Sequence, residues 1–382
     1  MHVAHQPDTK TRRLSPEHEE TIKETLPVVG AHIGEITPLF YNKMFAKHPE
    51  LIKDTFNRGN QQQGEQQKAL AASIAVFASM LVDPNAPDPV EMLSRIAHKH
   101  VSLGITKDQY QIVHDNLFEA IVEVLGEAVT PEVAAAWDAV YWLMTDVLVD
   151  FENDLYASAQ VEPGDVFRRA RLMAKEQLTD SVSLFTFESE DLGEALPGQY
   201  TSIGVRLPDG ARQLRQYSLV SAEQGRWVIA VEQDGEVSTF LHQNLAMGEE
   251  VDITLPAGDL VLQEGSNPVV LISQGIGSTP MVGMLAALQD SGREVVVLHA
   301  DESADTYAQR AQTQQLAQNH HEFFRSEGQR LEVAGRIPSG ADVYLCGGSG
   351  FLQNVRDQIA ALPEQPAALH FELFSPNDWL VS

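Results

Sequence analysis

The hydrophobic periodicity of this sequence changes twice along the chain, and each change restricts the folds that the chain can adopt. Through about residue 155, apolar residues recur at steps of three and four, which is typical of helices. The clearest helix is predicted over Pro131–Tyr156 behind the N-cap candidate Thr130, and one of its faces carries Trp137, Tyr141, Met144, Leu148, Phe151 and Leu155. Other helices are expected at Ser15–Gly30, Gly34–Phe45, Gln61–Leu81, Pro89–His100 and Lys107–Gly126. We therefore predict an all-α N-terminal domain.

The helical pattern stops at Val161–Gly164, and from Phe167 to about Leu262 the sequence has the pattern of short strands and turns. Segments rich in β-branched and aromatic residues lie at Val182–Phe187, Trp227–Val231 and Val251–Leu255. Turn signals lie at Pro208–Gly210 and at Asp234-Gly235. This pattern predicts an antiparallel β-barrel.

A third pattern begins at Pro268, where buried-strand runs alternate with helical segments. Strands are expected at Val269–Ser273, Glu294–Leu298, Val343–Leu345 and Leu369–Phe374. Alternation of this kind predicts an α/β domain with a parallel sheet and helices on both of its faces. The predicted fold class is thus multidomain, with boundaries at residues 1–158, 163–264 and 267–382.

Composition limits the cellular setting and the partners. The net charge of −28 argues against a nucleic-acid partner, because phosphate binding needs clustered Lys and Arg. Cys346 is the single cysteine, so no intramolecular disulfide can form, which fits a reducing compartment. The polar stretch Met1–Ser15 lacks the apolar run of a signal peptide, and no stretch is as long as a membrane span. We expect a cytoplasmic, monomeric protein without stable membrane insertion.

Two glycine-rich turns each stand between a predicted strand and a predicted helix. The first lets backbone N–H groups approach a pyrophosphate, and it consists of Gln274, Gly275, Ile276, Gly277, Ser278, Thr279 and Pro280. Ser278 or Thr279 is predicted to cap the helix, and Pro280 suits its first position. One such loop is equally compatible with a purely structural turn. The second, Cys346-Gly347-Gly348-Ser349-Gly350, follows another predicted strand, so both turns are expected at one sheet edge, where they would form a nucleotide crevice.

The barrel segment carries the run Arg215–Leu219. An Arg can hold a pyrophosphate with a bidentate fork, and a Tyr ring can lie against an isoalloxazine, although the run alone also fits an ordinary strand. The order of several motifs is more specific: Pro197–Tyr200, Arg215–Ser218, Gly235–Ser238, the Gly275 turn, Cys346-Gly347 and Phe371–Phe374. This order resembles that of the ferredoxin–NADP reductase superfamily over roughly Val166–Ser382.

The resemblance implies FAD on the barrel and a nicotinamide nucleotide, NADH or NADPH, on the last domain. The implied flavin contacts are Tyr200, Arg215, Gln216, Tyr217, Ser218, Val237 and Ser238, with Glu372, Leu373, Phe374, Ser375 and Pro376 beside the flavin. Two residues depart from the family pattern: Gly348 stands where Pro is usual, and Ser375 stands where related proteins have Gly. Asp301 and Glu302 favour the ribose 2′-hydroxyl of NADH, and Arg310 could reverse that preference.

The helical segment resembles the globin of flavohaemoglobins. The matching residues are Phe40-Tyr41, Pro49–Leu51, Phe56-Asn57, Gln66, Leu70, Ile96–His100, Asp108–Tyr110 and Phe151-Glu152. This implies haem b, whose iron needs a neutral imidazole as axial ligand. His98 and His100 are two residues apart, so on a helix they point about 200° apart and only one can face the haem. The family pattern selects His100 and leaves His98 as an ordinary surface or core residue.

The same resemblance implies the surroundings of the iron. Tyr110 and Glu152 are expected beside the axial histidine, where a carboxylate that accepts the imidazole N–H makes it a stronger donor to iron. On the opposite side, Tyr41, Gln66 and Leu70 are expected near the bound ligand, and Phe56 against the porphyrin. Taken singly, these residues fit a packed core or a solvated helix face equally well.

The activity that the resemblance implies is nitric oxide dioxygenation, in which NO and O₂ become nitrate with electrons from NAD(P)H through FAD and haem. A non-enzymatic oxygen-binding or sensing globin and a general NAD(P)H-dependent reductase are the alternatives. Because flavin and haem must approach each other, we also expect Lys99, next to His100, to face Glu372 across a domain interface, directly or through a water.

Overall fold

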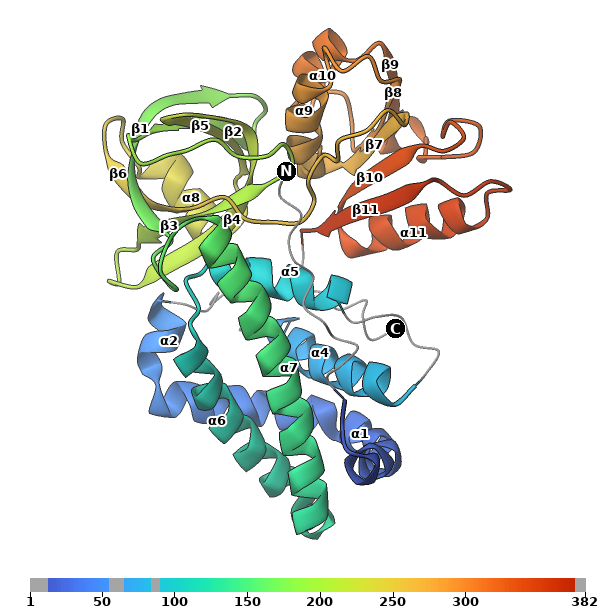
Figure 1. Cartoon of the computed structure of the whole chain (residues 1–382). Coiled ribbons are helices and arrows are strands. Elements are labelled where there is room, and N and C mark those ends of the chain that lie inside the picture. Colours follow the sequence, from blue (N-terminus) through green and yellow to red (C-terminus); the bar gives the residue numbers. More distant parts are fainter. Residues whose placement is uncertain (1–12, 55–64, 84–89, 375–382) are drawn as a thin grey trace. The chain divides into compact units, whose positions relative to one another are not determined.

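The computed structural model describes the backbone of residues 13–54, 65–83 and 90–374, and the side chains of residues 13–52, 73–83, 92–372 and 374. The chain forms two compact units, whose helices and strands are labelled in Figure 1. The first unit comprises the residues through Phe167 together with Arg206–Leu214. The second comprises Arg168–Val205 together with Arg215–Ser375.

The first unit is helical. Its described helices are α1 (Pro16–Lys47), α2 (Pro49–Asp54), α4 (Glu65–Val82), α5 (Val90–Val101), α6 (Lys107–Leu125), the short 3₁₀ turn η1 (Gly126–Ala128) and α7 (Pro131–Ser158). The predicted N-cap of α7 is confirmed, because the Thr130 hydroxyl accepts the Val133 N–H at 3.3 Å. Thr106 and Gln109 form a capping box at the start of α6.

The helices expected at Ser15–Gly30 and Gly34–Phe45 are one continuous helix, α1. Gly30 and Gly34 together cost a helix about 2 kcal/mol relative to alanine. That cost is offset because apolar side chains continue along one side of α1 through both glycines, each worth roughly 1.5–3 kcal/mol when buried. The buried members are Ile22, Val29, Ile36, Phe40 and Met44.

The core of this unit is built on α7, as its sequence pattern predicts. Trp137, Met144, Leu148 and Phe151 are all buried, and they pack with Leu93 and Ala97 of α5 and Ile22 of α1. The packing fixes the end of α5 against α7, and this arrangement positions the candidate site described below.

The second unit contains a closed six-stranded barrel with the order β1-β2-β5-β4-β3-β6, as predicted. Its elements are β1 (Phe167–Gln177), β2 (Val182–Glu188), β3 (Tyr200–Arg206), β4 (Arg212–Glu223), β5 (Arg226–Glu232), α8 (Glu236–Gln243) and β6 (Glu250–Thr254). Side chains at alternate positions along the strands fill the barrel interior, and the largest of these buried side chains are Phe185, Phe187 and Trp227.

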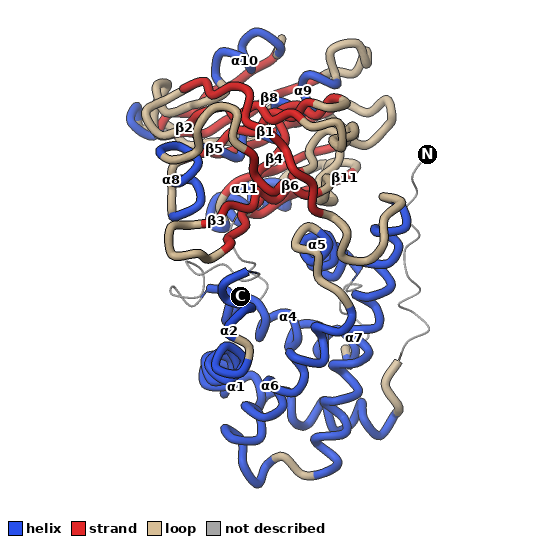
Figure 2. The backbone as a smooth tube through the Cα atoms, turned by 90° about the vertical axis from the view of Figure 1, so that its left-hand side faces the viewer, coloured by secondary structure: helices blue, strands red, loops and turns tan. Residues whose placement is uncertain are grey.

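The second unit also contains a five-stranded parallel sheet of order β11-β10-β7-β8-β9. The strands are β7 (Val269–Gln274), β8 (Val295–Asp301), β9 (Asn319–Phe324), β10 (Asp342–Gly347) and β11 (Ala368–Leu373). The helices are α9 (Ser278–Ala287), α10 (Arg310–Leu316) and α11 (Ser349–Ala360), with short 3₁₀ turns η2 (Gly275–Gly277) and η3 (Arg325–Glu327). Among the described residues, all strands belong to the barrel and this sheet (Figure 2).

The edge strand β9 is the one element of the sheet that the sequence pattern does not predict. Its first four residues, Asn319-His320-His321-Glu322, are polar. An edge strand pairs on one side only and its side chains need not be buried, so a hydrophobic signal is not required of it.

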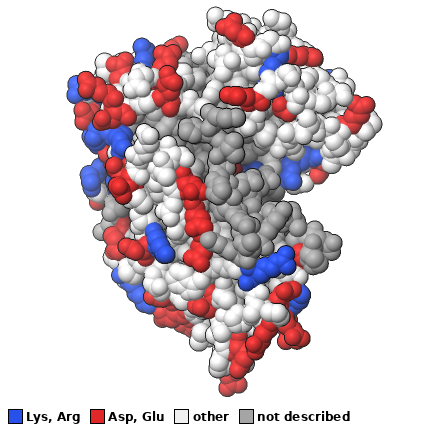
Figure 3. Space-filling model, viewed as in Figure 1, with Lys and Arg blue, Asp and Glu red and all other residues white. Residues whose placement is uncertain are grey.

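Acidic side chains are spread over the molecular face in Figure 3, as expected for a chain with 54 Asp and Glu against 26 Lys and Arg. Of the helices that the structure describes, none combines the length and the apolar character needed to cross a bilayer.

Candidate functional site

His100 lies in the last turn of α5 and is held by two partners through one ring nitrogen. Its Nδ1 lies 2.8 Å from Glu152 Oε1 and 2.9 Å from the Tyr110 hydroxyl oxygen. Because a carboxylate only accepts hydrogen bonds, Nδ1 carries a hydrogen and donates a hydrogen bond to Glu152. Nε2 is therefore the nitrogen that bears a lone pair and could ligate a metal.

Glu152 lies in the C-terminal part of α7 and is 2% exposed, so it is a buried carboxylate and not part of a solvated helix face. Tyr110 also donates its hydroxyl hydrogen to Glu152 Oε1, at 2.5 Å. Burial, with the nearby charge of Glu152, raises the pKa of Tyr110, so the hydroxyl keeps its proton and remains a donor. One carboxylate oxygen thus receives two hydrogen bonds and fixes the orientation of the His100 ring.

Local structure brings these three residues together from positions up to 52 apart in the chain. The α5 helix ends at a loop whose Leu103 and Ile105 N–H groups both donate to the His100 carbonyl at 3.0 Å. The Tyr156 hydroxyl of α7 donates to the Ile105 carbonyl at 2.7 Å, which ties that loop to α7. The loop therefore holds Tyr110, at the start of α6, opposite the His100 ring.

The two other polar residues near the end of α5 differ from His100. His98 is half-buried, and Lys99 is exposed. The local geometry favours His100 as the ligand, because Nδ1 of His100 is the nitrogen that Glu152 and Tyr110 hold.

On α1, the Tyr41 side chain is buried, and its ring packs against Phe40 and Phe45 at centroid distances of 4.6 and 5.6 Å. Gln66 and Leu70 both lie on α4, four residues apart, but their side chains are outside the described residues. Phe56 lies outside the described residues altogether. The structure therefore places Tyr41 in the helical core, and the predictions for Gln66, Leu70 and Phe56 stay untested.

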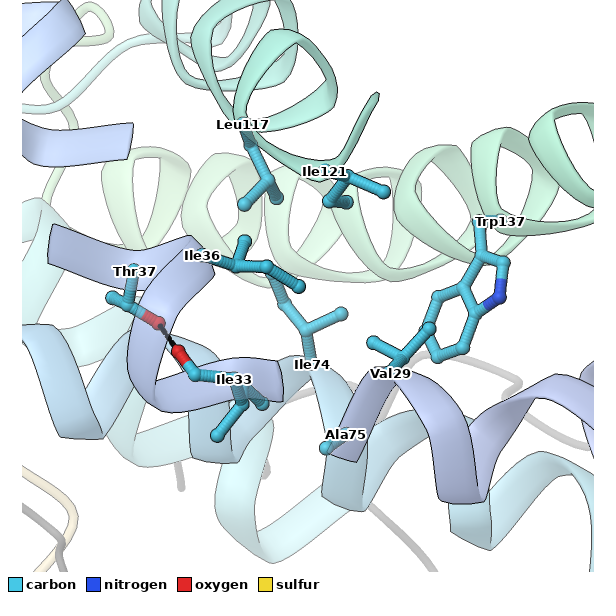
Figure 4. Close-up of a pocket in the computed structure, with 9 residues that line it drawn as sticks. All are labelled: Val29, Ile33, Ile36, Thr37, Ile74, Ala75, Leu117, Ile121 and Trp137. Carbon is cyan, nitrogen blue, oxygen red and sulfur yellow. Dashed lines mark hydrogen bonds between the residues drawn. The ribbon is translucent and has the colours of Figure 1, made fainter. Parts of the chain in front are cut away.

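An apolar pocket lies between α1, α4, α6 and α7 (Figure 4). Eight of its nine lining residues are apolar: Val29, Ile33, Ile36, Ile74, Ala75, Leu117, Ile121 and Trp137. The ninth, Thr37, donates its hydroxyl hydrogen to the Ile33 carbonyl at 2.7 Å and so offers no free donor to the pocket. Thr37 precedes Tyr41 by one helical turn, so the pocket begins close to that residue. A space of this character suits small, weakly polar molecules.

In the second unit, Arg215, Gln216, Tyr217 and Ser218 lie in β4, as expected. Arg215 pairs with Glu236 of α8, and Gln216 donates to the Ser202 hydroxyl of β3 at 3.1 Å. Tyr217 is half-buried, which leaves part of its ring accessible to a planar ligand. Tyr200 begins β3 and is buried, while Val237 and Ser238 are buried in the first turn of α8.

The two glycine-rich turns lie side by side, because β7 and β10 are neighbouring parallel strands. A Cβ atom added to Gly277 would lie 2.6 Å from the Cys346 carbonyl oxygen. Only glycine allows this approach of the two turns. Cys346 is fully buried, and burial raises the pKa of its thiol. The two turns therefore meet at the carboxyl edge of a parallel sheet, which is the edge at which nucleotides bind in folds of this kind.

The prediction that Ser278 or Thr279 caps α9 is wrong. Gly277 is the N-cap, and no side chain caps the helix. Pro280 is the third residue of α9 and not its first, because the helix already begins at Ser278. The Ser278 hydroxyl donates to the Gly275 carbonyl and contacts Gln309, and the Thr279 hydroxyl donates to the Ile276 carbonyl at 2.8 Å. Both hydroxyls turn back into the loop, and the Ser278 N–H also bonds the Gly275 and Ile276 carbonyls, so the start of α9 is held by the preceding turn instead of by a side-chain cap.

Sequence reasoning missed Gln309, which is fully buried beneath that turn. Its amide contacts the Ser278 hydroxyl and donates to the Thr279 hydroxyl at 3.2 Å. Gln309 precedes α10 and is about thirty residues from its partners. No local pattern indicates such a contact, because only the parallel packing of the sheet and helices brings the residues together.

At the end of β8, the Asp301 carboxylate is already engaged within the protein. It accepts the Thr306 hydroxyl at 2.5 Å, the Glu302 N–H at 2.7 Å, and His299 Nε2 at 3.1 Å. Arg310 is held by both oxygens of Glu322, at 2.9 and 2.8 Å. Arg310 would have to leave this bidentate pair before it could bind a 2′-phosphate.

The end of β11 carries the remaining predicted residues. Glu372 is in register with Cys346 of β10 and is half-buried. The Phe374 N–H donates to the Gly347 carbonyl at 3.3 Å, and the Phe374 side chain is 42% exposed. The side chain of Leu373 is outside the described residues, and so are Ser375 and Pro376.

A globin-type helical unit joined to a β-barrel and a nucleotide-type parallel sheet defines a globin–reductase fusion. A globin model matches residues 39–148, and a model described as an oxidoreductase FAD-binding domain matches residues 169–261. The flavohemoprotein of Deinococcus radiodurans is 37% identical over 397 residues, covering 95% of this chain and 98% of that protein. The chain belongs to the flavohemoprotein family.

Solved structures agree with this assignment. A crystal structure of flavohemoglobin from Malassezia yamatoensis with bound FAD and heme superposes with a TM-score of 0.87 at 35% identity, and covers 95% of this chain and 100% of that chain. The FAD/NAD binding domain of nitric oxide dioxygenase from Vibrio cholerae superposes with a TM-score of 0.52 at 32% identity, and covers 55% of this chain and 99% of that domain.

Proposed function

We propose that the chain is a nitric oxide dioxygenase, which converts NO and O₂ to nitrate at haem b with electrons from NADH or NADPH delivered through FAD. The single observation that carries this proposal is the buried Glu152 carboxylate on Nδ1 of His100. An oxygen carrier needs only a neutral imidazole, whereas a carboxylate partner makes the ligand a stronger electron donor and suits an iron that does chemistry.

The residues of the first unit fit a haem. His100 has one nitrogen held by protein and a second with a lone pair for the iron. The relative from Malassezia yamatoensis carries heme and FAD in its crystal structure, and it matches this chain over its whole length. When bound, haem supplies a redox-active iron and FAD supplies single electrons from a two-electron donor.

The residues of the second unit fit a flavin and a dinucleotide. Arg215 and the N-terminus of α8 offer positive charge to the FAD diphosphate, and the half-buried Tyr217 offers a ring face. The tight turn at Gly275 and Gly277 would let the diphosphate of the nicotinamide cofactor approach the backbone at the carboxyl edge of the sheet. We propose NADH as the preferred donor, because Arg310 is held by Glu322.

The proposed roles rest on the described positions of His100, Tyr110, Glu152 and Tyr41, and on the family resemblance for Gln66, Leu70 and Phe56. His100 would hold the iron, while Glu152 and Tyr110 keep its ring oriented and its Nδ1 proton in place. Tyr41 and Gln66 would donate hydrogen bonds to a polar ligand on the opposite side, beside Leu70, and Phe56 would pack against the porphyrin. The apolar pocket beside Thr37 gives the two weakly polar substrates a space near that ligand.

The domain boundaries at residues 158, 163–264 and 267 are part of the proposal, since α7 ends at Ser158, β1 begins at Phe167 and β7 begins at Val269. A cytoplasmic, monomeric state is proposed with them. The pairing of Lys99 with Glu372 stays a prediction.

The experiment that tests the proposal follows NADH oxidation by the purified full chain in air. Addition of NO is expected to accelerate NADH oxidation and to yield nitrate in proportion to the NO consumed. If NADH oxidation does not accelerate when NO is added, the chain is an oxygen-binding globin or a general reductase and the dioxygenase proposal is wrong.

The Tyr41→Phe variant is expected to release O₂ faster than the wild-type chain. Loss of one hydrogen bond to a polar ligand costs on the order of 1–3 kcal/mol, or about ten- to a hundredfold in the off-rate. Stopped-flow ligand replacement measures this rate. Carbon monoxide serves as the control ligand, because it accepts hydrogen bonds weakly and its off-rate should change much less. An unchanged O₂ off-rate would show that the Tyr41 hydroxyl is directed elsewhere.

The Glu152→Gln variant is expected to raise the midpoint potential of the haem iron. The neutral amide accepts the His100 proton less strongly, so the imidazole stabilises the ferric state less. The expected rise is about 60 mV, which corresponds to a tenfold change in a one-electron equilibrium. Spectroelectrochemistry measures the potential, and the control is Asp154→Asn, which removes one charge from a half-buried carboxylate two residues away on α7. An equal shift in both variants would indicate a general charge effect instead.

A further inference from the structure

The guanidinium expected to bind the FAD diphosphate is already engaged by a carboxylate. Arg215 Nη2 of β4 lies 3.3 Å from Glu236 Oε1 of α8, and their side chains are 20% and 32% exposed. A pair that is mostly withdrawn from solvent is screened less than a surface pair. Glu236 therefore neutralises the cation that a phosphate group would need.

Glu236 also occupies the second positive feature of this region, the N-terminus of α8. It is the first residue of that eight-residue helix, behind Gly235 with φ +93°, and no side chain caps the helix. The Ser238 hydroxyl accepts the Asp234 N–H at 2.8 Å, which fixes the loop and with it the position of Glu236. A carboxylate in the first turn is stabilised by the helix dipole, as a phosphate would be.

The loop before α8 adds further negative charge. Glu232 ends β5, and Asp234 follows it by two residues. Burial, together with the charges of Asp234 and Asp301, raises the pKa of Glu232, so these carboxylates crowd one another. A diphosphate that enters here meets one arginine whose charge is already shared and a loop that repels it.

We propose that Glu236 competes with the FAD diphosphate for Arg215 and thereby sets how tightly the chain holds its flavin. This inference rests on the proposed function, since it assumes that Arg215 binds FAD. Glu236 must release Arg215, or share it with a dianion at close range, when the flavin binds. FAD affinity is therefore lower than Arg215 and the α8 N-terminus would otherwise allow.

The test is the affinity of the flavin-depleted full chain for FAD, measured by quenching of flavin fluorescence. Glu236→Gln is expected to lower the FAD dissociation constant about fivefold, because the diphosphate no longer has to displace the Glu236 carboxylate from its ion pair with Arg215. The matched control is Glu188→Gln, which removes one charge from a carboxylate that pairs with Arg226 at 3.9 Å elsewhere on the same barrel. The control is expected to bind FAD like the wild-type chain.

Two further measurements separate competition from a structural effect. Riboflavin has no phosphate, so its affinity should be the same in Glu236→Gln and in the wild-type chain. In an Arg215→Ala background, Glu236→Gln should change FAD affinity less than twofold, because the shared cation is gone. A Glu236→Gln variant that binds FAD no more tightly, that binds riboflavin more tightly as well, or that keeps its full effect without Arg215 overturns the inference. If the wild-type chain itself binds no FAD, the proposed function fails along with it.

Discussion

Replacing His100 by alanine is expected to abolish haem binding, while His98→Ala retains it. His100 is the residue whose Nδ1 is fixed by Glu152 and Tyr110, so its removal takes away the axial ligand. It also leaves the buried Glu152 carboxylate with one donor fewer, at a cost of roughly 1–3 kcal/mol in folding stability. The haem content per chain, from the absorbance of a pyridine haemochrome, measures the result.

A His100→Gly variant separates loss of the ligand from loss of the fold. Free imidazole can fill the space that the side chain leaves, and its addition is expected to restore haem binding to a folded chain. Circular dichroism checks that the helices remain. Normal haem content in His100→Ala without added imidazole, or loss of haem in His98→Ala alone, would contradict the assignment of the axial ligand.

The second large effect is expected for Gly277→Ala in the nucleotide turn. The new Cβ would lie 2.6 Å from the Cys346 oxygen and 2.9 Å from the Cys346 carbonyl carbon, so the two turns would have to separate. A displacement of about 1 Å in a positioning element costs roughly a hundredfold in rate. We expect flavin reduction by NADH to slow by about that factor while FAD and haem contents stay normal.

Gly350→Ala is the matched control for this variant. Gly350 is the last residue of the other glycine-rich turn and lies in the first turn of α11, and no atom is found within 4 Å of a Cβ added there. Alanine in a helix is more favourable than glycine by about 1 kcal/mol, so the control should be as stable as the wild-type chain or more so. Stopped-flow reduction of the flavin compares the two. Equal rates for Gly277→Ala and Gly350→Ala would mean that the turn does not position the nucleotide.

Periodic apolar patterns predicted most of the fold. The apolar stripe on α7 forms the core of the helical unit, and the two strand-to-helix turns meet at adjacent strands of one sheet, as expected. Such patterns are informative because burial repeats with the period of the secondary structure. The pattern fails where burial is partial, as in the edge strand β9, or where tertiary packing overrides local preference, as in α1 across Gly30 and Gly34.

Contacts between polar side chains were less predictable. The resemblance to flavohaemoglobins identified His100, Tyr110 and Glu152 as site residues, and the structure brings these three residues within hydrogen-bonding distance of one another. Neither Gln309 beneath the α9 turn nor Glu236 against Arg215 is indicated by any local pattern. These residues meet their partners only after strands and helices distant in the sequence have packed, and a glutamine or glutamate at a single position carries no periodic signal.

The measurement that tests the account most directly is the absorption spectrum of the purified full chain mixed with NADH under carbon monoxide without oxygen. The account predicts that the flavin is reduced and that the Soret band of carbon monoxide-bound ferrous haem then appears. The same chain depleted of FAD should show no such band with NADH, although dithionite should produce it. Haem that stays ferric while the flavin is reduced, or haem reduced by NADH equally well without FAD, would contradict the transfer of electrons from NADH through FAD to the iron held by His100.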